Sequence, residues 1–231
     1  MKNGFTMIEL LVGIVIAMLC MIMMLMLFKQ ISKVSLESMQ DAQYDSQIQT
    51  GTLVIQKLLQ NAGYGIDRRD ETPPQNDVLI GEINDSPAIF WRVLDSDPAD
   101  STGIQNYKCE ALVSENDVTH KEYKLILLTS NPNACGRDTV LDNSTLWTTA
   151  TNFSKSSLIT IKNSNITATT DPIFNFSIND LAVGKNCTPY GISENNPTGY
   201  KYITVTAKSK DLAIKDIQQV ICLNNIFRST T

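Results

Sequence analysis

Residues 1–30 read MKNGFTMIELLVGIVIAMLCMIMMLMLFKQ, an apolar run with one carboxylate, Glu9, at its start. The 19 residues from Leu10 to Phe28 carry no charge, and at about 1.5 Å each they form a helix about 28 Å long. That length matches the hydrocarbon core of a bilayer. Lys29 and Lys33 follow the run without a small-x-small cleavage site, so we expect a membrane anchor rather than a cleaved secretory signal.

Glu9 needs a physical reason to stand at the start of this run. A carboxylate in the middle of a membrane costs about 2.5–3.5 kcal/mol on insertion scales, and less near the interface. In one interpretation Glu9 lies shallow and reaches the headgroups. In the other, a cation within an assembly neutralises it. The best such cation is the free α-amine of a neighbouring chain, which requires a cut just before the run, at a site such as Gly4–Phe5.

The composition is that of a folded, acidic protein. Of the 231 residues, 42% are hydrophobic and 19% are charged, which suits a folded chain better than a disordered one. The chain has 19 Lys and Arg against 24 Asp and Glu, a formal net charge of −5. This balance argues against a surface built throughout to bind nucleic acid.

The five cysteines divide between the two parts of the chain. Cys20 lies in the apolar run and the other four follow it. An even number outside the membrane predicts two disulfides in an oxidising compartment, with four reduced, buried thiols as the alternative. Four cysteines permit three pairings. We favour Cys109–Cys135 and Cys187–Cys222, because neighbours in sequence need the shorter closures, and each bond would contribute roughly 3–4 kcal/mol in the chain-entropy model.

The octet G-F-T-M-I-E-L-L from Gly4 to Leu11 resembles the G-F-T-L-I-E-L-L signature of type IV prepilins and the related type II secretion pseudopilins, with Met7 as its one departure. In that family a prepilin peptidase cuts after the glycine on the cytoplasmic face and methylates the new N-terminal residue. The resemblance implies cleavage between Gly4 and Phe5, N-methylation of Phe5, and pairing of Glu9 with a neighbour's terminal amine. Such a pair would set the axial register of a filament, a role that suits buried ion pairs.

The apolar run continues into an amphipathic pattern. Beyond Lys29, apolar residues recur at every third or fourth position, which predicts a helix with one buried face. No proline occurs before Pro73, and Gly51 costs only roughly 1 kcal/mol relative to alanine. We therefore expect one helix from Phe5 to Ala62, about 87 Å long.

The end of this helix carries a second resemblance. Gly63 suits the left-handed position that ends many helices. Independently of that role, the segment LLQNAGYG from Leu58 to Gly65 resembles the L-x-x-A-G-Y-x-G segment of PilW-type minor pilins. The resemblance is short, and it favours a PilW-type chain over other minor pilins.

After Pro73 and Pro74 the pattern changes to short β-branched or aromatic segments bounded by Asn, Asp, Pro and Gly, which is typical of strands. We expect an antiparallel sheet packed on the C-terminal half of the helix, an α+β head of the type IV pilin kind. Long connections between strands are candidate contact surfaces. The expected strands are Val78–Ile83, Ala88–Leu94, Tyr123–Thr129, Leu158–Lys162, Ile173–Ile178, Tyr200–Ala207 and Gln218–Leu223. The long connections are Asp95–Gly103, Asn131–Leu146 and Lys185–Gly199. The chain would thus comprise a leader at 1–4, a transmembrane and polymerisation helix at 5–28, an amphipathic spine helix at 29–65 and a periplasmic β-rich head at 66–231.

Catalytic and metal-binding patterns find little support. No nucleophile motif, phosphate loop or zinc pattern is present, so we expect no enzyme, no cofactor and no metal. The single histidine, His120, lies in the polar stretch Asn116–Glu122, which predicts a surface turn. The stretch Asp95–Asp100 departs from a calcium loop because Ala99 takes the fifth position and no glycine takes the sixth.

An aromatic and basic stretch near the C-terminus has the composition to stack bases and meet phosphates. An ordinary strand with solvated lysines is the simpler interpretation, and a weak DNA contact is the alternative hypothesis. We call these residues the aromatic–basic stretch: Tyr190, Tyr200, Lys201, Tyr202, Lys208, Lys210 and Lys215.

Together with the resemblances, these patterns predict a minor pilin of a bacterial type IV pilus. It would span the inner-membrane lipid once, be processed by prepilin peptidase, and join other minor and major pilins to initiate or cap a filament for twitching motility, adhesion or DNA uptake. The nearest alternative is a J-type type II secretion pseudopilin, which shares the same N-terminal features. A further alternative is a membrane-tethered periplasmic enzyme or receptor that never polymerises.

Overall fold

A computed structural model describes most of the chain, and structural statements below refer to that part. The described residues are 7–66, 76–95, 106–132, 134–142, 144–162, 171–182, 187, 199–209 and 216–227.

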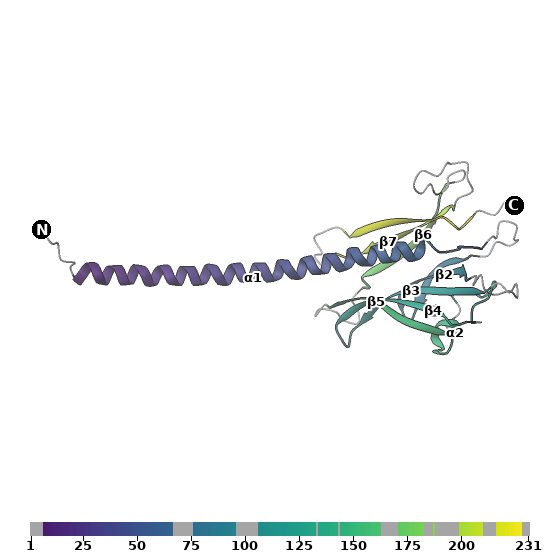
Figure 1. Ribbon diagram of the computed structural model, residues 1–231, viewed down its shortest axis with the longest axis horizontal. Coiled ribbons are helices and arrows are strands. Elements are labelled where there is room, and N and C mark those ends of the chain that lie inside the picture. Colours follow the sequence, from purple (N-terminus) through teal and green to yellow (C-terminus); the bar gives the residue numbers. More distant parts are fainter. Residues whose placement is uncertain are drawn as a thin grey trace. The chain divides into compact units, whose positions relative to one another are not determined.

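The described part of the chain begins with one long helix, α1, which spans Met7–Leu59 (53 residues; Figure 1). At about 1.5 Å per residue it is about 80 Å long. Glu9 in its first turn and Lys57 in its last turn both complement the helix dipole. The expected helix ended at Ala62, but turns begin at Gln60. The prediction of one continuous helix through the apolar and amphipathic segments is confirmed.

The chain divides into two compact units within α1. The first unit ends at Asp45, and the second comprises Ser46 to Thr231; we call the second the head unit. Within the head unit, Ile48, Ile55 and Leu59 of α1 are at most 1% exposed. Their spacing of seven and four residues places them on one face of the helix, which is therefore the face that packs into the head.

The head unit contains a five-stranded antiparallel sheet in which neighbours in sequence pair in the order β1-β2-β3-β4-β5. We call it sheet A. A β-bulge between Leu125 and Ile126 interrupts the register of the last pair. The strands are β1 (Val78–Ile83), β2 (Ser86–Leu94), β3 (Tyr107–Asp117), β4 (Glu122–Ser130) and β5 (Phe153–Lys162).

A second antiparallel sheet, sheet B, has three strands in the order β6-β7-β8. In β7, Ile203, Val205 and Ala207 are buried and the residues between them are half-buried, as expected for a strand with one buried face. The backbone N–H of Phe174 donates to Oγ of Ser114 at 3.1 Å and links β6 to β3 of sheet A. The strands are β6 (Phe174–Asp180), β7 (Lys201–Ala207) and β8 (Ile217–Leu223).

The α+β fold with a long N-terminal helix and antiparallel sheets, a pilin-like architecture, is confirmed, but its details differ from the expectation. The head has two sheets rather than one, and β3 was not predicted. In β3, Lys108 and Glu110 interrupt the apolar pattern. Glu110 is nevertheless only 9% exposed. Its burial is tolerated because its carboxylate accepts a hydrogen bond from Trp91 Nε1 at 2.9 Å and forms an ion pair with Lys108 at 2.9 Å. The polar residues broke the alternating pattern that predicts a strand, and the partners that stabilise them are not visible in the sequence.

One face of sheet A carries a hydrophobic core cluster of the head. Paired side chains of β2, β3 and β4 line this face, and Trp147 packs against it, so we call it the Trp147 face. The rings of Phe90 and Trp147 lie 5.8 Å apart, and those of Trp147 and Phe153 lie 6.3 Å apart, in tilted arrangements favourable for aromatic pairs. The core residues are Ala88, Phe90, Cys109, Ala111, Val113, Ile126, Leu128, Cys135, Leu141, Leu146 and Trp147.

The segment after β4 covers part of the Trp147 face. It includes the short helix α2 (Ser144–Thr148), which was not predicted, and Trp147 Nε1 donates to the carbonyl oxygen of Leu141 at 2.6 Å. Arg92 is 1% exposed, pairs with Asp77 at 2.9 Å and donates to the carbonyl oxygens of Arg137 and Thr139. Part of the Asn131–Leu146 connection, which was predicted as a candidate contact surface, is therefore buried against the sheet, and its role as a contact surface stays a prediction.

The end of α1 is fixed by the C-terminal segment and by β2. Asn225 Nδ2 donates to the carbonyl oxygens of Gln60 and Ala62 at 3.1 and 3.4 Å, which caps the helix. Gly63 has φ +75°, and its N–H donates to the carbonyl oxygen of Arg92 at 2.8 Å. Gly63 thus has the left-handed conformation that the sequence predicted, but it lies in the turn that follows the helix rather than directly after Leu59.

Candidate functional site

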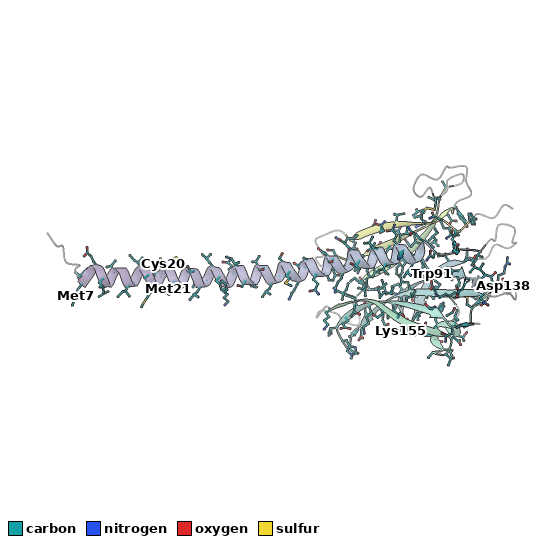
Figure 2. The ribbon with its side chains drawn as sticks, in the orientation of Figure 1. Met7, Cys20, Met21, Trp91, Asp138 and Lys155 are labelled. Atoms are coloured by element: carbon teal, nitrogen blue, oxygen red, sulfur yellow. A yellow bond between two sulfur atoms is a disulfide. The ribbon has the colours of Figure 1, made fainter. Side chains whose placement is uncertain are left out.

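The N-terminal part of α1 presents an apolar surface on all sides. Every large apolar side chain from Met7 to Phe28 is at least 48% exposed in this chain. Figure 2 shows Met7, Cys20 and Met21 standing out from the helix. Among the described residues, α1 alone is long and apolar enough to cross a membrane. A helix that is apolar all round and not covered by its own protein needs lipid or other apolar helices around it.

Glu9 is the acidic residue of this surface. It lies in the first turn of α1 and its side chain is exposed. The helix dipole favours a negative charge there, since the first backbone N–H groups have no partner within the helix. The predicted cleavage and methylation residues, Gly4 and Phe5, lie outside the described residues. The chemistry that the site offers is therefore a carboxylate at the start of a membrane-length helix, directly after the predicted cut.

Comparison with known proteins bears on this same segment. Residues 1–25 match the family model described as the prokaryotic N-terminal methylation motif. The matched segment contains Gly4, Phe5 and Glu9, and it marks a type IV prepilin-like N-terminus. No curated protein matches the chain. No solved structure matches it.

The four cysteines beyond the apolar run form two disulfides, Cys109–Cys135 and Cys187–Cys222, which is the pairing that the sequence favours. The first ties β3 to the segment that covers the Trp147 face. The second ties a residue before β7 to β8, and the Cys187 N–H also donates to the carbonyl oxygen of Gly199 at 2.6 Å. Cys20 in α1 is free and exposed. Both bonds therefore lie in the head unit.

The described lysines of the aromatic–basic stretch are paired with carboxylates. Lys201 Nζ lies 2.8 Å from Asp180 Oδ1 and 5.0 Å from the centre of the Tyr200 ring. Lys208 forms an ion pair with Asp171. Each pair offsets a positive charge that would otherwise attract phosphate. Tyr202 lies in β7, whereas Tyr190, Lys210 and Lys215 lie outside the described residues. The DNA contact stays a prediction.

The turn that contains His120, which the sequence predicted as a surface turn, joins β3 to β4. Asp117 accepts a hydrogen bond from Lys124 and from the backbone N–H of His120 at 3.0 Å, and it lies 2.8 Å from Nδ1 of the same histidine. These donors hold the pKa of the Asp117 carboxyl well below its usual value, with Lys124 the largest cause. The carboxylate in turn raises the pKa of Lys124. This cluster closes a hairpin turn.

The described residues contain no group of three or more His, Cys, Asp or Glu side chains that could hold a metal ion. Most of the Asp95–Asp100 stretch lies outside the described residues.

A groove lined by both polar and apolar side chains lies on the Trp147 face, and no sequence pattern predicted it. It includes Glu115 and Lys155, whose side chains form an ion pair of 3.1 Å between β3 and β5. Alternation of side chains along β3 places Glu115 on the same face as Val113. The sequence could have placed Glu115 on this face only if β3 had been predicted as a strand.

Proposed function

We propose that this chain is a minor pilin of a bacterial type IV pilus, which enters the filament through α1 and helps to initiate or cap it. Three features support the proposal: the methylation motif at residues 1–25, the apolar surface of α1, and a disulfide-bonded head of pilin-like architecture. The single observation that carries it is the position of Glu9, an exposed carboxylate in the first turn of a membrane-length helix that the motif covers.

The mechanism follows from the chemistry of that position. Prepilin peptidase would remove the leader before Phe5, methylate the new amine, and leave the apolar helix at the N-terminus. The helix can pass from lipid into a bundle of pilin helices, because both environments accept an apolar surface. Glu9 would then pair with the terminal amine of a neighbouring pilin, and that pair would set the axial position of the subunit. The chain thus acts by assembly rather than by catalysis.

The test is incorporation of Glu9→Gln subunits into filaments. Removing one partner of a buried ion pair costs about 3–5 kcal/mol, so we expect at least about a tenfold fall in subunit content. Glu37→Gln is the matched control, since Glu37 lies on the same helix, is exposed and pairs only weakly with Lys33 at 3.8 Å. Mass spectrometry of sheared filaments would measure subunit content, the mature terminus and its methylation. Equal content of the Glu9→Gln variant and the unaltered protein would contradict the proposed pair.

The same strains separate the alternatives. A deletion that abolishes protein secretion but leaves pili intact would favour the J-type pseudopilin. A chain that is absent from every filament while a deletion strain keeps both functions would favour a membrane-tethered enzyme or receptor.

A further inference from the structure

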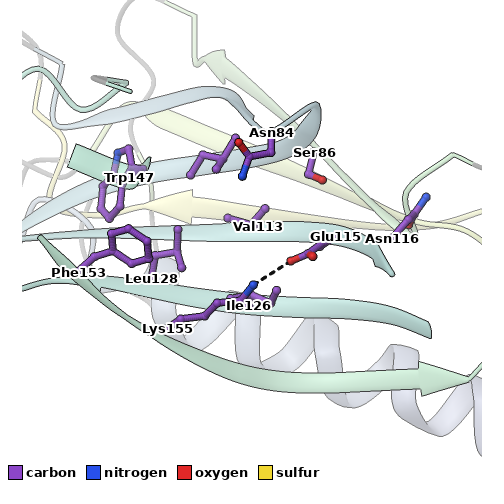
Figure 3. Close-up of a pocket in the computed structure, with 11 residues that line it drawn as sticks. Asn84, Ser86, Val113, Glu115, Asn116, Ile126, Leu128, Trp147, Phe153 and Lys155 are labelled. Carbon is purple, nitrogen blue, oxygen red and sulfur yellow. Dashed lines mark hydrogen bonds and ion pairs between the residues drawn. The ribbon is translucent and has the colours of Figure 1, made fainter. Parts of the chain in front are cut away.

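A groove of about 240 Å³ opens on the Trp147 face of sheet A (Figure 3). We call it the Trp147 groove. Apolar side chains form its floor, and polar side chains from strands β2, β3 and β5 and from the β1–β2 turn form its rim. The floor comprises Ile83, Val113, Ile126, Leu128, Trp147 and Phe153. The rim comprises Asn84, Ser86, Glu115, Asn116 and Lys155.

The groove exists because the covering segment protects only part of the sheet. Trp147 lies at one end of the groove and Asn116, near the end of β3, lies at the other, while Asn84 of the β1–β2 turn lies between them (Figure 3). Between them, Glu115 of β3 and Lys155 of β5 extend toward each other across β4. Six elements therefore hold the walls, which makes the groove a preformed feature of the fold.

The rim is polar but carries no net charge. Nζ of Lys155 and Oε2 of Glu115 lie 3.1 Å apart, and their side chains are 56% and 38% exposed. A charged ligand would meet a like charge beside the opposite charge that attracts it, so the pair gives neither sign of charge a net attraction. A neutral ligand can instead accept from the ammonium and donate to the carboxylate without separating them. The pair therefore favours a neutral ligand that has both donors and acceptors.

The floor adds an apolar platform. Trp147 is 2% exposed and supports the ring of Phe153, which is half-buried and lies 6.3 Å away, so Phe153 is the ring that a ligand can touch. The volume is below the roughly 300–1,000 Å³ of sites for drug-sized ligands. The space therefore suits a single ring that has an apolar face and hydroxyl groups along its edge.

We propose that the Trp147 groove binds one ring of a neutral saccharide. The apolar C–H face of the ring packs on Phe153 and the aliphatic floor, while its hydroxyls bond to the amide of Asn84, the hydroxyl of Ser86 and the Glu115–Lys155 pair. Such ligands occur in the glycan strands of a cell wall and in the glycans of a cell surface.

The test is a ligand-observed saturation-transfer NMR titration of the full chain in lipid nanodiscs. The probes are the N-acetylglucosamine trimer, which represents a cell-wall glycan, and N-acetyllactosamine, which represents a surface glycan. Sorbitol is the control, because it has hydroxyls but no ring. We expect at least one glycan to bind and sorbitol not to bind. Binding of the trimer alone, or of N-acetyllactosamine alone, supports the proposal and identifies the source.

Two turn variants assign the binding to the groove. Asn84 and Asp85 have φ values of 50° and 61°, which glycine adopts without strain, so both can be replaced without disturbing the turn. Asn84→Gly removes a rim amide, and loss of one hydrogen bond lowers affinity by about tenfold. Asp85→Gly makes the same change next to the groove and should leave affinity unaltered. Failure of both glycans to bind, equal binding of sorbitol, or unchanged affinity of Asn84→Gly would overturn the proposal.

Discussion

Replacing Gly51 with alanine sets helix propensity against packing in the head unit. Propensity alone favours alanine in a helix interior by about 1 kcal/mol. The structure reverses the sign, because a Cβ atom on Gly51 would lie 2.7 Å from Cζ of Phe174 and 2.9 Å from Cδ1 of Ile159. Ordinary carbon–carbon contacts lie at about 3.5–4.0 Å. Gly51 is therefore the residue that lets α1 approach both sheets closely.

The size of the effect follows from what can move. Ile159 can turn its terminal methyl group away, but Phe174 is fully buried, so the helix or β6 has to shift. Overpacking of this kind costs about 1–3 kcal/mol. Subtracting the gain in propensity leaves a net loss of up to about 2 kcal/mol in the free energy of unfolding. For a unit of this size each kcal/mol lowers Tm by about 2–4 °C, so we expect a fall of up to about 8 °C.

Thermal unfolding of the full chain in detergent measures this change, with the fluorescence of Trp91 and Trp147 as the signal, since both indoles are buried in the head. Gly13→Ala is the matched control, because it makes the same substitution in α1 where a Cβ atom meets nothing within 4 Å. Adding Phe174→Leu to Gly51→Ala should recover part of the loss. An increase in Tm for Gly51→Ala would refute the packing argument and would show that helix propensity dominates the change in stability.

Two further predictions concern charge. Lys124 and His120 hold the pKa of Asp117 below its usual 3.8, so its stabilising effect is complete above about pH 4 and is lost as the pH falls further. Asp117→Asn should therefore reduce the decline in unfolding temperature between about pH 4 and pH 2, and an unchanged decline would contradict the assignment. If the aromatic–basic stretch contacts DNA, Asp180→Asn should strengthen binding to a duplex oligonucleotide, most at low salt, because it releases Lys201. Unchanged DNA binding by Lys201→Ala would remove that contact.

The parts of the fold that were predictable depend on local patterns. The uncharged run after Glu9 determines a membrane-length helix by itself, and the spacing of seven residues between Ile48 and Ile55, two helical turns, identifies the face that packs in the head. Most strands were recognised because β-branched residues alternate between turn residues. The cysteine pairs followed from loop length, since each joins neighbours in sequence.

The parts that were not predictable depend on distant partners. Glu110 is stable inside β3 because Trp91 Nε1 donates a hydrogen bond to its carboxylate. The strand that contains Arg92 was predicted, but the pairing of Arg92 with Asp77 and its hydrogen bonds to two backbone carbonyls were not. The sequence around a polar residue does not show whether a distant residue will form a hydrogen bond or ion pair with it in the folded protein. The Trp147 groove has the same origin, since its rim brings together residues as far apart as Asn84 and Lys155.

The segment Ala62-Gly63-Tyr64-Gly65, which follows α1, contains residues that bear on the fold and one that bears on the pilin subtype. Gly63 and Gly65 have φ values of +75° and +74°, and a Cβ atom on them would lie 2.5 Å from Ile226 and 2.8 Å from Leu94. Both positions need glycine in any chain where the turn after the helix has positive φ values and packs this closely on neighbouring side chains. The glycines therefore support the pilin-like fold and do not by themselves favour a PilW-type chain. Tyr64 differs, because its side chain is 62% exposed between the two left-handed glycines. Packing in the head therefore does not account for a tyrosine at this position. The resemblance to PilW-type chains consequently depends on Tyr64 rather than on the glycines.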